Sequence, residues 1–381
     1  MTVGDAENVD RIPLIQPDLP DMADLVADLD RAFKSGRITN FGPLVEQFES
    51  EVSEYVGGAE AVTVSSGTMG LLFVLQALNL QPGARVAVPS FTFTASAQAI
   101  LYAGGRPIFV DVAEDLTMDT NDLDEVINRN EVAVVMPVHT FGLPARTEEI
   151  DTVVKNSSNQ PAVVYDAAHA FGSSDGDTAV GAFGTAEVFS LSATKALVAV
   201  EGGAVTTTNL DLANRLRKMR NYGIEANYDA WYPGLNGKMS ELHAAVGLFN
   251  LRRLDEILAT RRSLAARYLE LVTSQTSFRV IPERSGVGHT YKDFSVYLPE
   301  ALYGKQTEVI ESLGRRGIET RRYFYPPLHE QRLFQEYVDR PLPRTEELSR
   351  RVLCLPFFTT MTDRQMETVV EAMRQVEMEL T

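Results

Sequence analysis

Short apolar segments alternate with longer segments of helical periodicity along the first half of this chain of 381 residues. The apolar segments have the length of buried strands and fall at residues 61–64, 85–89, 107–111, 133–138, 162–165 and 204–207. Strands that alternate with helices pair in parallel, because each helix returns the chain to the edge where the previous strand began. The sequence therefore predicts an α/β fold built on a mostly parallel sheet.

The pattern changes near residue 270, where strands and helices no longer alternate regularly. The elements expected there are a strand at 291–298, a helix at 307–314 and a strand at 318–325. A long helix, capped by Ser240 and running to about residue 269, is expected to join the two parts. We therefore predict a large domain over residues 12–250, which begins with a helical segment, and a small α+β domain over 251–381. Residues 1–11 are polar and are predicted to be mobile.

One lysine stands in an unusually apolar setting. Lys195 lies between apolar segments, with the hydroxyl groups of Ser190, Ser192 and Thr194 before it and Glu201-Gly202-Gly203 after it. Loss of hydration lowers the pKa of a lysine, and the neutral amine is then a nucleophile that can form a Schiff base. The hydroxyls suit a phosphate group, and the two glycines allow a backbone to pass close to a ligand. Most lysines on loops are surface residues, but these neighbours favour a reactive one.

An acidic residue supports the same interpretation. Asp166 ends the predicted strand 162–165, and the carboxyl ends of parallel strands face the crevice in which open α/β sheets bind ligands. An aspartate there suits pyridoxal phosphate, because the pyridine nitrogen must stay protonated if the ring is to act as an electron sink. Asp166 alone could equally be a helix N-cap. Asp166 and Lys195 together favour the cofactor.

Composition narrows the classes of function. The 52 acidic and 35 basic residues give a net charge of −17, whereas a nucleic-acid-binding surface needs a basic stripe. No apolar run is long enough to span a bilayer, and residues 1–7 lack the features of a signal peptide, so we expect a cytosolic protein. The five histidines show no metal-ligand spacing, and we expect no metal site. The single cysteine, Cys354, lies in an apolar run and is predicted to be part of the core.

Three motifs resemble those of one enzyme family. They are Asp166-Ala167-Ala168-His169, the sequence FSLSATK at 189–195, and Glu201-Gly202-Gly203-Ala204. All three are similar, in this order, to motifs of the DegT/DnrJ/EryC1/StrS sugar aminotransferases, and the resemblance extends from residue 12 to about residue 373. It implies the aspartate aminotransferase-like fold (fold type I), with a seven-stranded, mostly parallel sheet between helices and a smaller α+β domain.

The resemblance also implies roles for individual residues. Lys195 would hold pyridoxal 5'-phosphate as an imine, with Asp166 at the pyridine nitrogen. The other expected cofactor contacts are Gly67, Thr68, Phe93, His169, Ser190 and, from the neighbouring subunit, Asn236. The expected substrate contacts are Lys238, Tyr323 and His329. From the residues alone, Gly67 and Thr68 could also begin an ordinary capped helix, and Phe93 could be part of the core.

The same resemblance implies a homodimer that moves an amino group, usually from L-glutamate, to a nucleotide-linked keto-deoxy sugar. The sequences NGKM at 236–239 and RYFYP at 322–326 look most like members that aminate carbon 4 of a dTDP-4-keto-6-deoxyhexose. Ser192 and His169 depart from the histidine and glutamine that many members have near the cofactor. The acceptor or its orientation can therefore differ from that of the commonest members.

Three alternatives stay open at this point. One branch of the family dehydrates sugars and has histidine in place of the lysine, which Lys195 disfavours. The acceptor could also be a 3-keto sugar or a free cyclitol ketone rather than a 4-keto sugar. The third alternative is a regulator that binds the cofactor without catalysis. Such a protein would have no reason to keep Lys195, Asp166 and Glu201-Gly202-Gly203 together.

Overall fold

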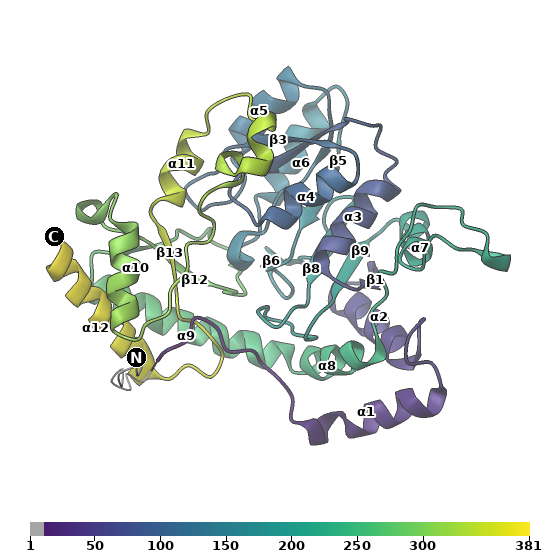
Figure 1. Ribbon diagram of the computed structural model, residues 1–381, viewed down its shortest axis with the longest axis horizontal. Coiled ribbons are helices and arrows are strands. Elements are labelled where there is room, and N and C mark those ends of the chain that lie inside the picture. Colours follow the sequence, from purple (N-terminus) through teal and green to yellow (C-terminus); the bar gives the residue numbers. More distant parts are fainter. Residues whose placement is uncertain (1–10) are drawn as a thin grey trace, which may run out of the picture.

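A seven-stranded sheet forms the centre of the computed structural model, which describes residues 11–381 (Figure 1). Its order is β1-β9-β8-β5-β4-β2-β3. The strands are β1 (Glu60–Val64), β2 (Arg85–Pro89), β3 (Arg106–Val110), β4 (Val132–Val135), β5 (Ala162–Asp166), β8 (Ala186–Ser190) and β9 (Gly203–Thr207). Only β9 runs antiparallel to its neighbours β1 and β8, and every other pair is parallel. The prediction of a mostly parallel sheet between helices is confirmed.

Helices cover both faces of this sheet, because alternate side chains of each strand point to opposite faces. Val62 and Val64 share a buried cluster with the helices of one face, which are α3 (Gly67–Ala77), α4 (Thr94–Tyr102) and α7 (Leu210–Met219). On the opposite face, α5 (Thr120–Arg129) and α6 (Thr147–Asn156) pack against one half of the sheet. The other half of that face is covered by α1 (Met22–Ser35), α2 (Pro43–Tyr55) and α8 (Glu241–Arg252).

The C-terminal part of the chain forms a second cluster of elements. Its sheet has the order β10-β12-β13, made of β10 (Arg279–Val280), β12 (Phe294–Tyr297) and β13 (Val352–Leu355). It packs with α9 (Leu254–Gln275), α10 (Gln306–Arg315) and α12 (Asp363–Leu380), while α11 (Pro343–Ser349) precedes β13. A third small sheet joins β11 (Val287–Gly288) to β6 (Ser174–Asp175) and β7 (Thr178–Ala179) of the N-terminal part. Figure 1 shows α9 running from α8 towards the small sheet.

The long helix expected from Ser240 to about residue 269 is in fact two helices. Ser240 does cap α8, since its side chain accepts a hydrogen bond from the His243 N–H. Arg253 then breaks the helical path, and α9 continues from Leu254 to Gln275. The division into domains at residue 250 stays a proposal, and it lies close to this break. The mobile segment predicted for residues 1–11 falls, except for Arg11, outside the described residues.

The prediction of a strand at 318–325 is wrong. The structure has only two isolated bridges there, between Ile12 and Ile318 and between Arg321 and Cys354. The next residues leave the sheet in a turn, in which the Tyr325 N–H donates to the Arg322 carbonyl. Tyr323 and Phe324 thereby reach a cavity in place of a strand face. Cys354 itself is fully buried beside the Ser295 hydroxyl, so its assignment to the core is confirmed.

Candidate active site

A cavity of about 340 Å³ lies where the carboxyl ends of β1, β2, β5 and β8 meet the segment after Ile318. Most of the predicted site residues line it, although they are spread over more than 250 positions of the sequence. They are Gly67, Thr68, Phe93, Asp166, His169, Ser190, Lys195 and Tyr323. The parallel sheet explains this convergence, because it ends its strands at one common edge. The three other predicted residues, discussed below, do not line this cavity.

The start of α3 forms the end of the cavity that suits an anion. Ser66 caps this helix, and its hydroxyl accepts from the Met69 N–H over 3.2 Å. Gly67 and Thr68 follow in the first turn, where backbone N–H groups and the helix dipole favour negative charge. Ser190 reaches the same place from β8: a Cβ placed on Gly67 would lie 3.1 Å from the Ser190 Cβ. These groups can together hold a phosphate.

The sequence suggested that Gly202 and Gly203 let a backbone pass close to a ligand, but the structure gives them another role. The described cavity lining includes neither of them. Gly203 pairs with both Val64 and Ser190, so β9 passes directly beneath the start of α3. A Cβ on Gly203 would be 2.7 Å from the Gly67 nitrogen. The glycine is therefore needed for the close approach of two backbone segments, and it supports the phosphate-binding turn indirectly.

We expect Gly203→Ala to weaken cofactor binding and to lower the free energy of unfolding by about 1–3 kcal/mol, the usual effect of overpacking. The added methyl group must displace the backbone of Gly67, which cannot move without disturbing the turn. Thermal unfolding and cofactor titration measure the two effects. Gly314→Ala is the matched control, since a Cβ there meets no atom within 4 Å. Equal behaviour of the two variants would contradict this account.

Lys195 lies on the turn between β8 and β9, and its side chain is half-buried at the cavity. Burial, together with the ammonium group of Lys292, lowers the pKa of Lys195 to about 7. The depression predicted from the apolar neighbours is thus confirmed. At neutral pH a large fraction of this side chain is the free amine, which is the form that attacks a carbonyl carbon.

Asp166 is the last residue of β5 and is buried. One carboxylate oxygen accepts from the Ser96 hydroxyl at 2.6 Å, and the other accepts from the Ala168 N–H at 3.1 Å. No helix begins here in the described chain, which excludes the N-cap alternative. Burial raises the pKa of Asp166. A protonated pyridine nitrogen beside it would favour the carboxylate again, because opposite charges stabilise each other.

Aromatic rings form a wall of the cavity. The half-buried His169 ring stacks on those of Phe141 and Phe324, with centroid distances of 6.3 and 6.4 Å. Its Nδ1 atom accepts from the Phe141 N–H, and burial lowers the pKa of His169 well below its usual value, so the ring is neutral. Phe93 lies 6.4 Å from Phe324 and is 57% exposed. A phenylalanine that is exposed at a cavity can cover a flat ligand ring.

Asn236 and Lys238 lie outside this cavity. Asn236 is exposed and forms an isolated bridge with Asn221. The Lys238 ammonium donates to the Asn221 side chain at 3.0 Å and lies over the Tyr222 ring. Asn236 was assigned to the neighbouring subunit, so its exposure in a single chain agrees with that assignment without testing it.

His329 also fails to reach the cavity. It is buried, with Nδ1 2.6 Å from the Ser90 hydroxyl, and its ring packs near Phe109. The turn at Pro327–Glu330 holds it beside Ser90, which follows β2, since the Leu328 N–H donates to the Ser90 carbonyl. His329 does not line this cavity, so the geometry of the single chain adds no support to its predicted substrate contact.

Sequence reasoning missed Lys292, which lines the cavity although it is only 4% exposed. A signal was present, because Lys292 and Asp293 come directly before the apolar strand β12. Charges next to a buried strand need partners. Phe324 also lines the cavity, but the sequence had named it only within the motif RYFYP and had given it no role of its own.

The residues of the cavity fit pyridoxal phosphate. A phosphate fits at the start of α3, a pyridine nitrogen fits at Asp166, and an amine is present at Lys195. The close approach of Gly67 to Ser190 leaves no room for a side chain at the phosphate end. Among the described residues, by contrast, no group of three or more histidine, cysteine, aspartate or glutamate side chains could hold a metal ion. Nor does any described helix have the length and apolar character to cross a membrane.

Comparison with known proteins agrees with this geometry. The DegT/DnrJ/EryC1/StrS aminotransferase family model matches residues 21–374. The dTDP-4-amino-4,6-dideoxy-D-glucose transaminase of Escherichia coli is 28% identical, over 92% of this chain and 95% of that protein. The GDP-perosamine synthase of Escherichia coli O157:H7 is 31% identical, over 96% and 98%.

A solved structure shows the same fold. The structure of DesI, determined in the presence of its TDP-sugar product, superimposes with a TM-score of 0.89 at 34% identity. The match covers 97% of this chain and 96% of that chain. The chain therefore belongs to the DegT/DnrJ/EryC1/StrS aminotransferase family, and it is a pyridoxal phosphate-dependent sugar aminotransferase.

Proposed function

We propose that the enzyme transfers the amino group of L-glutamate to carbon 4 of dTDP-4-keto-6-deoxyglucose. The observation that carries the reaction class is the presence of Lys195, with its lowered pKa, and Asp166 in one cavity with an anion site. The dTDP sugar is supported by the names of two similar proteins, one a dTDP-sugar transaminase and the other solved with a TDP-sugar product. A cytosolic location stays a prediction.

The residues of the cavity have different roles in the proposed reaction. Bound pyridoxal phosphate supplies an electron sink that stabilises negative charge at the donor α-carbon. Gly67, Thr68 and Ser190 bind the phosphate, and Asp166 keeps the ring nitrogen protonated. Lys195 takes the proton from the donor α-carbon and delivers it to the cofactor carbon that is bonded to the transferred nitrogen. In the second half of the cycle the same amine moves a proton in the opposite direction, onto the carbon of the sugar.

We further propose a homodimer with shared active sites. Large apolar side chains are exposed on the single chain, among them Met22, Val26 and Phe33 of α1, Leu242 of α8, and Tyr228, Trp231 and Leu235 after α7. The segment after α7 projects from the molecule on the right of Figure 1. Exposed apolar surface of this kind marks an interface. Asn236 lies directly after this segment and is itself exposed, so a partner seated on it would bring a site within reach of Asn236.

The two half-reactions test the proposed function. The purified protein, loaded with pyridoxal phosphate, is mixed with single amino acids while the absorbance change to pyridoxamine phosphate is followed. We expect L-glutamate to give the highest kcat/KM. The aminated form is then offered dTDP-4-keto-6-deoxyglucose, its GDP-linked counterpart, a nucleotide-linked 3-keto sugar and free inosose. A preference for any acceptor but the first would overturn the sugar assignment, and the absence of conversion with every amino acid would overturn the reaction class.

A further inference from the structure

A second lysine, Lys292, shares the cavity with Lys195. It is 4% exposed, and its ammonium donates to both carboxylate oxygens of Asp293 at 2.9 Å. It also lies 5.1 Å from the centre of the Tyr323 ring. An ammonium has three N–H donors, and the contacts within the described chain use two of them. One donor is left for a group in the cavity.

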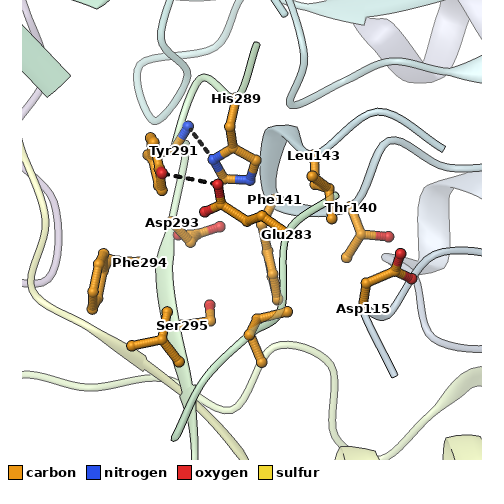
Figure 2. Close-up of a pocket in the computed structure, with 12 residues that line it drawn as sticks. Asp115, Thr140, Phe141, Leu143, Glu283, His289, Tyr291, Asp293, Phe294 and Ser295 are labelled. Atoms are coloured by element: carbon orange, nitrogen blue, oxygen red, sulfur yellow. Dashed lines mark hydrogen bonds between the residues drawn. The ribbon is translucent and has the colours of Figure 1, made fainter. Parts of the chain in front are cut away.

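The Lys292–Asp293 pair presents its positive end to the cavity. Lys292 lines that cavity, whereas Asp293 lines a different and much smaller one of about 20 Å³. Figure 2 shows Asp293 in this second cavity, together with Glu283, His289 and Tyr291. The charges therefore act unequally on Lys195: the ammonium of Lys292 lowers its pKa more than the carboxylate of Asp293 raises it.

The position of this pair is fixed by the surrounding backbone. The Lys292 N–H donates to the Phe141 carbonyl, and its own carbonyl accepts from the buried Arg261. A buried ion pair costs desolvation energy that its own attraction often fails to offset, so it is weak evidence for a role in stability alone. A fixed charge that faces a reaction cavity is better explained by a ligand of opposite sign.

The charges that line the cavity identify that ligand. Among its described lining residues the acids are Asp166 and Glu201, and the lysines are Lys195 and Lys292. An α-amino acid donor carries a carboxylate bonded directly to the carbon that Lys195 deprotonates. Lys195 must stay available for proton transfer, which leaves Lys292 as the cation for this carboxylate. We propose that Lys292 binds the α-carboxylate of the amino donor, an inference that rests on the proposed function, in which the donor is L-glutamate.

Two amino donors that differ only in the α-carboxylate can test this contact. L-Glutamate is compared with 4-aminobutanoate, which is glutamate without its α-carboxylate, in the donor half-reaction. In Lys292→Met/Asp293→Asn, which removes both charges, we expect kcat/KM for L-glutamate to fall by about ten- to a hundredfold, the range of a charge-assisted hydrogen bond. The value for 4-aminobutanoate should stay within about twofold. Lys292→Arg, which keeps the positive charge, should retain most of the preference for glutamate.

A binding measurement completes the test. α-Methyl-L-glutamate has no α-hydrogen to lose, so calorimetry reports its affinity without turnover. The double variant should bind it at least about tenfold more weakly than wild type does. If the double variant does not fold, Lys292→Gln serves instead, because its amide can still donate to Asp293 but carries no charge.

The outcomes separate this inference from the proposed function. Unchanged glutamate affinity, or an equal loss for glutamate and 4-aminobutanoate, would overturn the role of Lys292 while the aminotransferase assignment stands. A wild-type protein that converts no amino acid would instead reject the proposed function.

Discussion

Lys195→Ala is expected to lower the rate of both half-reactions by about 10⁴-fold, the upper end of what a positioned proton-transfer group contributes. The variant should still bind pyridoxal phosphate, because the start of α3, Ser190 and Asp166 remain in place. Treatment of the wild-type holoenzyme with borohydride, followed by mass spectrometry of its peptides, should find the cofactor on Lys195. Labelling of Lys292, the other lysine that lines the cavity, would show that the assignment is wrong.

The pKa of Lys195 gives a second measurement on the same residue. A lysine is protonated below its pKa, and only the neutral amine attacks the aldehyde of the cofactor. With a pKa of about 7, in place of the ordinary 10.5, the reactive fraction rises as the pH increases through 7. The rate at which the cofactor-free protein takes up pyridoxal phosphate should therefore be half-maximal near pH 7. A midpoint near pH 10 would mean that this amine is fully hydrated.

The central fold was predictable because its signal is local. Most strands of the large sheet are short apolar runs, and the alternation with helices indicates the parallel pairing of the strands other than β9. The break at Arg253 was not predictable from the periodic pattern, since apolar spacing continues across it into α9. The turn after Arg322 was missed for a different reason: Tyr323 and Phe324 suit a strand as well as a cavity wall, and only tertiary contacts decide between them.

The roles of Lys195 and Asp166 were predictable, because a Schiff base needs a lysine and a protonated pyridine nitrogen needs an acidic partner. Gly203 was misread because the sequence cannot show which backbone segment passes close to it, and that segment proves to be the start of α3. Lys292 was missed because its importance depends on the segment before β12 reaching the same cavity as Lys195. The position of His329 outside the cavity was not predictable, because a histidine beside arginines and aromatics carries no indication of the direction in which its ring points.

A mixture of two inactive variants is expected to regain activity if the active sites are shared. Asn236 is assigned to the phosphate of the neighbouring subunit, while Lys195 serves the cavity of its own chain. Lys195→Ala removes the proton-transfer amine. Asn236→Glu places a negative charge against the phosphate, where like charges repel. Each variant alone should be nearly inactive, and each is expected to fold, since Asn236 is exposed and Lys195 is only half-buried.

In a mixed dimer with two-fold symmetry, one active site contains both substitutions. The other active site has an intact Lys195 from one chain and an intact Asn236 from the other. Random exchange makes roughly half of the dimers mixed, so about a quarter of all sites should recover. The matched control mixes Lys195→Ala with the double variant Lys195→Ala/Asn236→Glu, a combination in which no chain supplies the amine. Mass spectrometry of intact dimers verifies that subunits have exchanged. If mixed dimers form and the activity stays at the level of the separate variants, Asn236 serves its own chain or no phosphate at all, and the shared site must be given up.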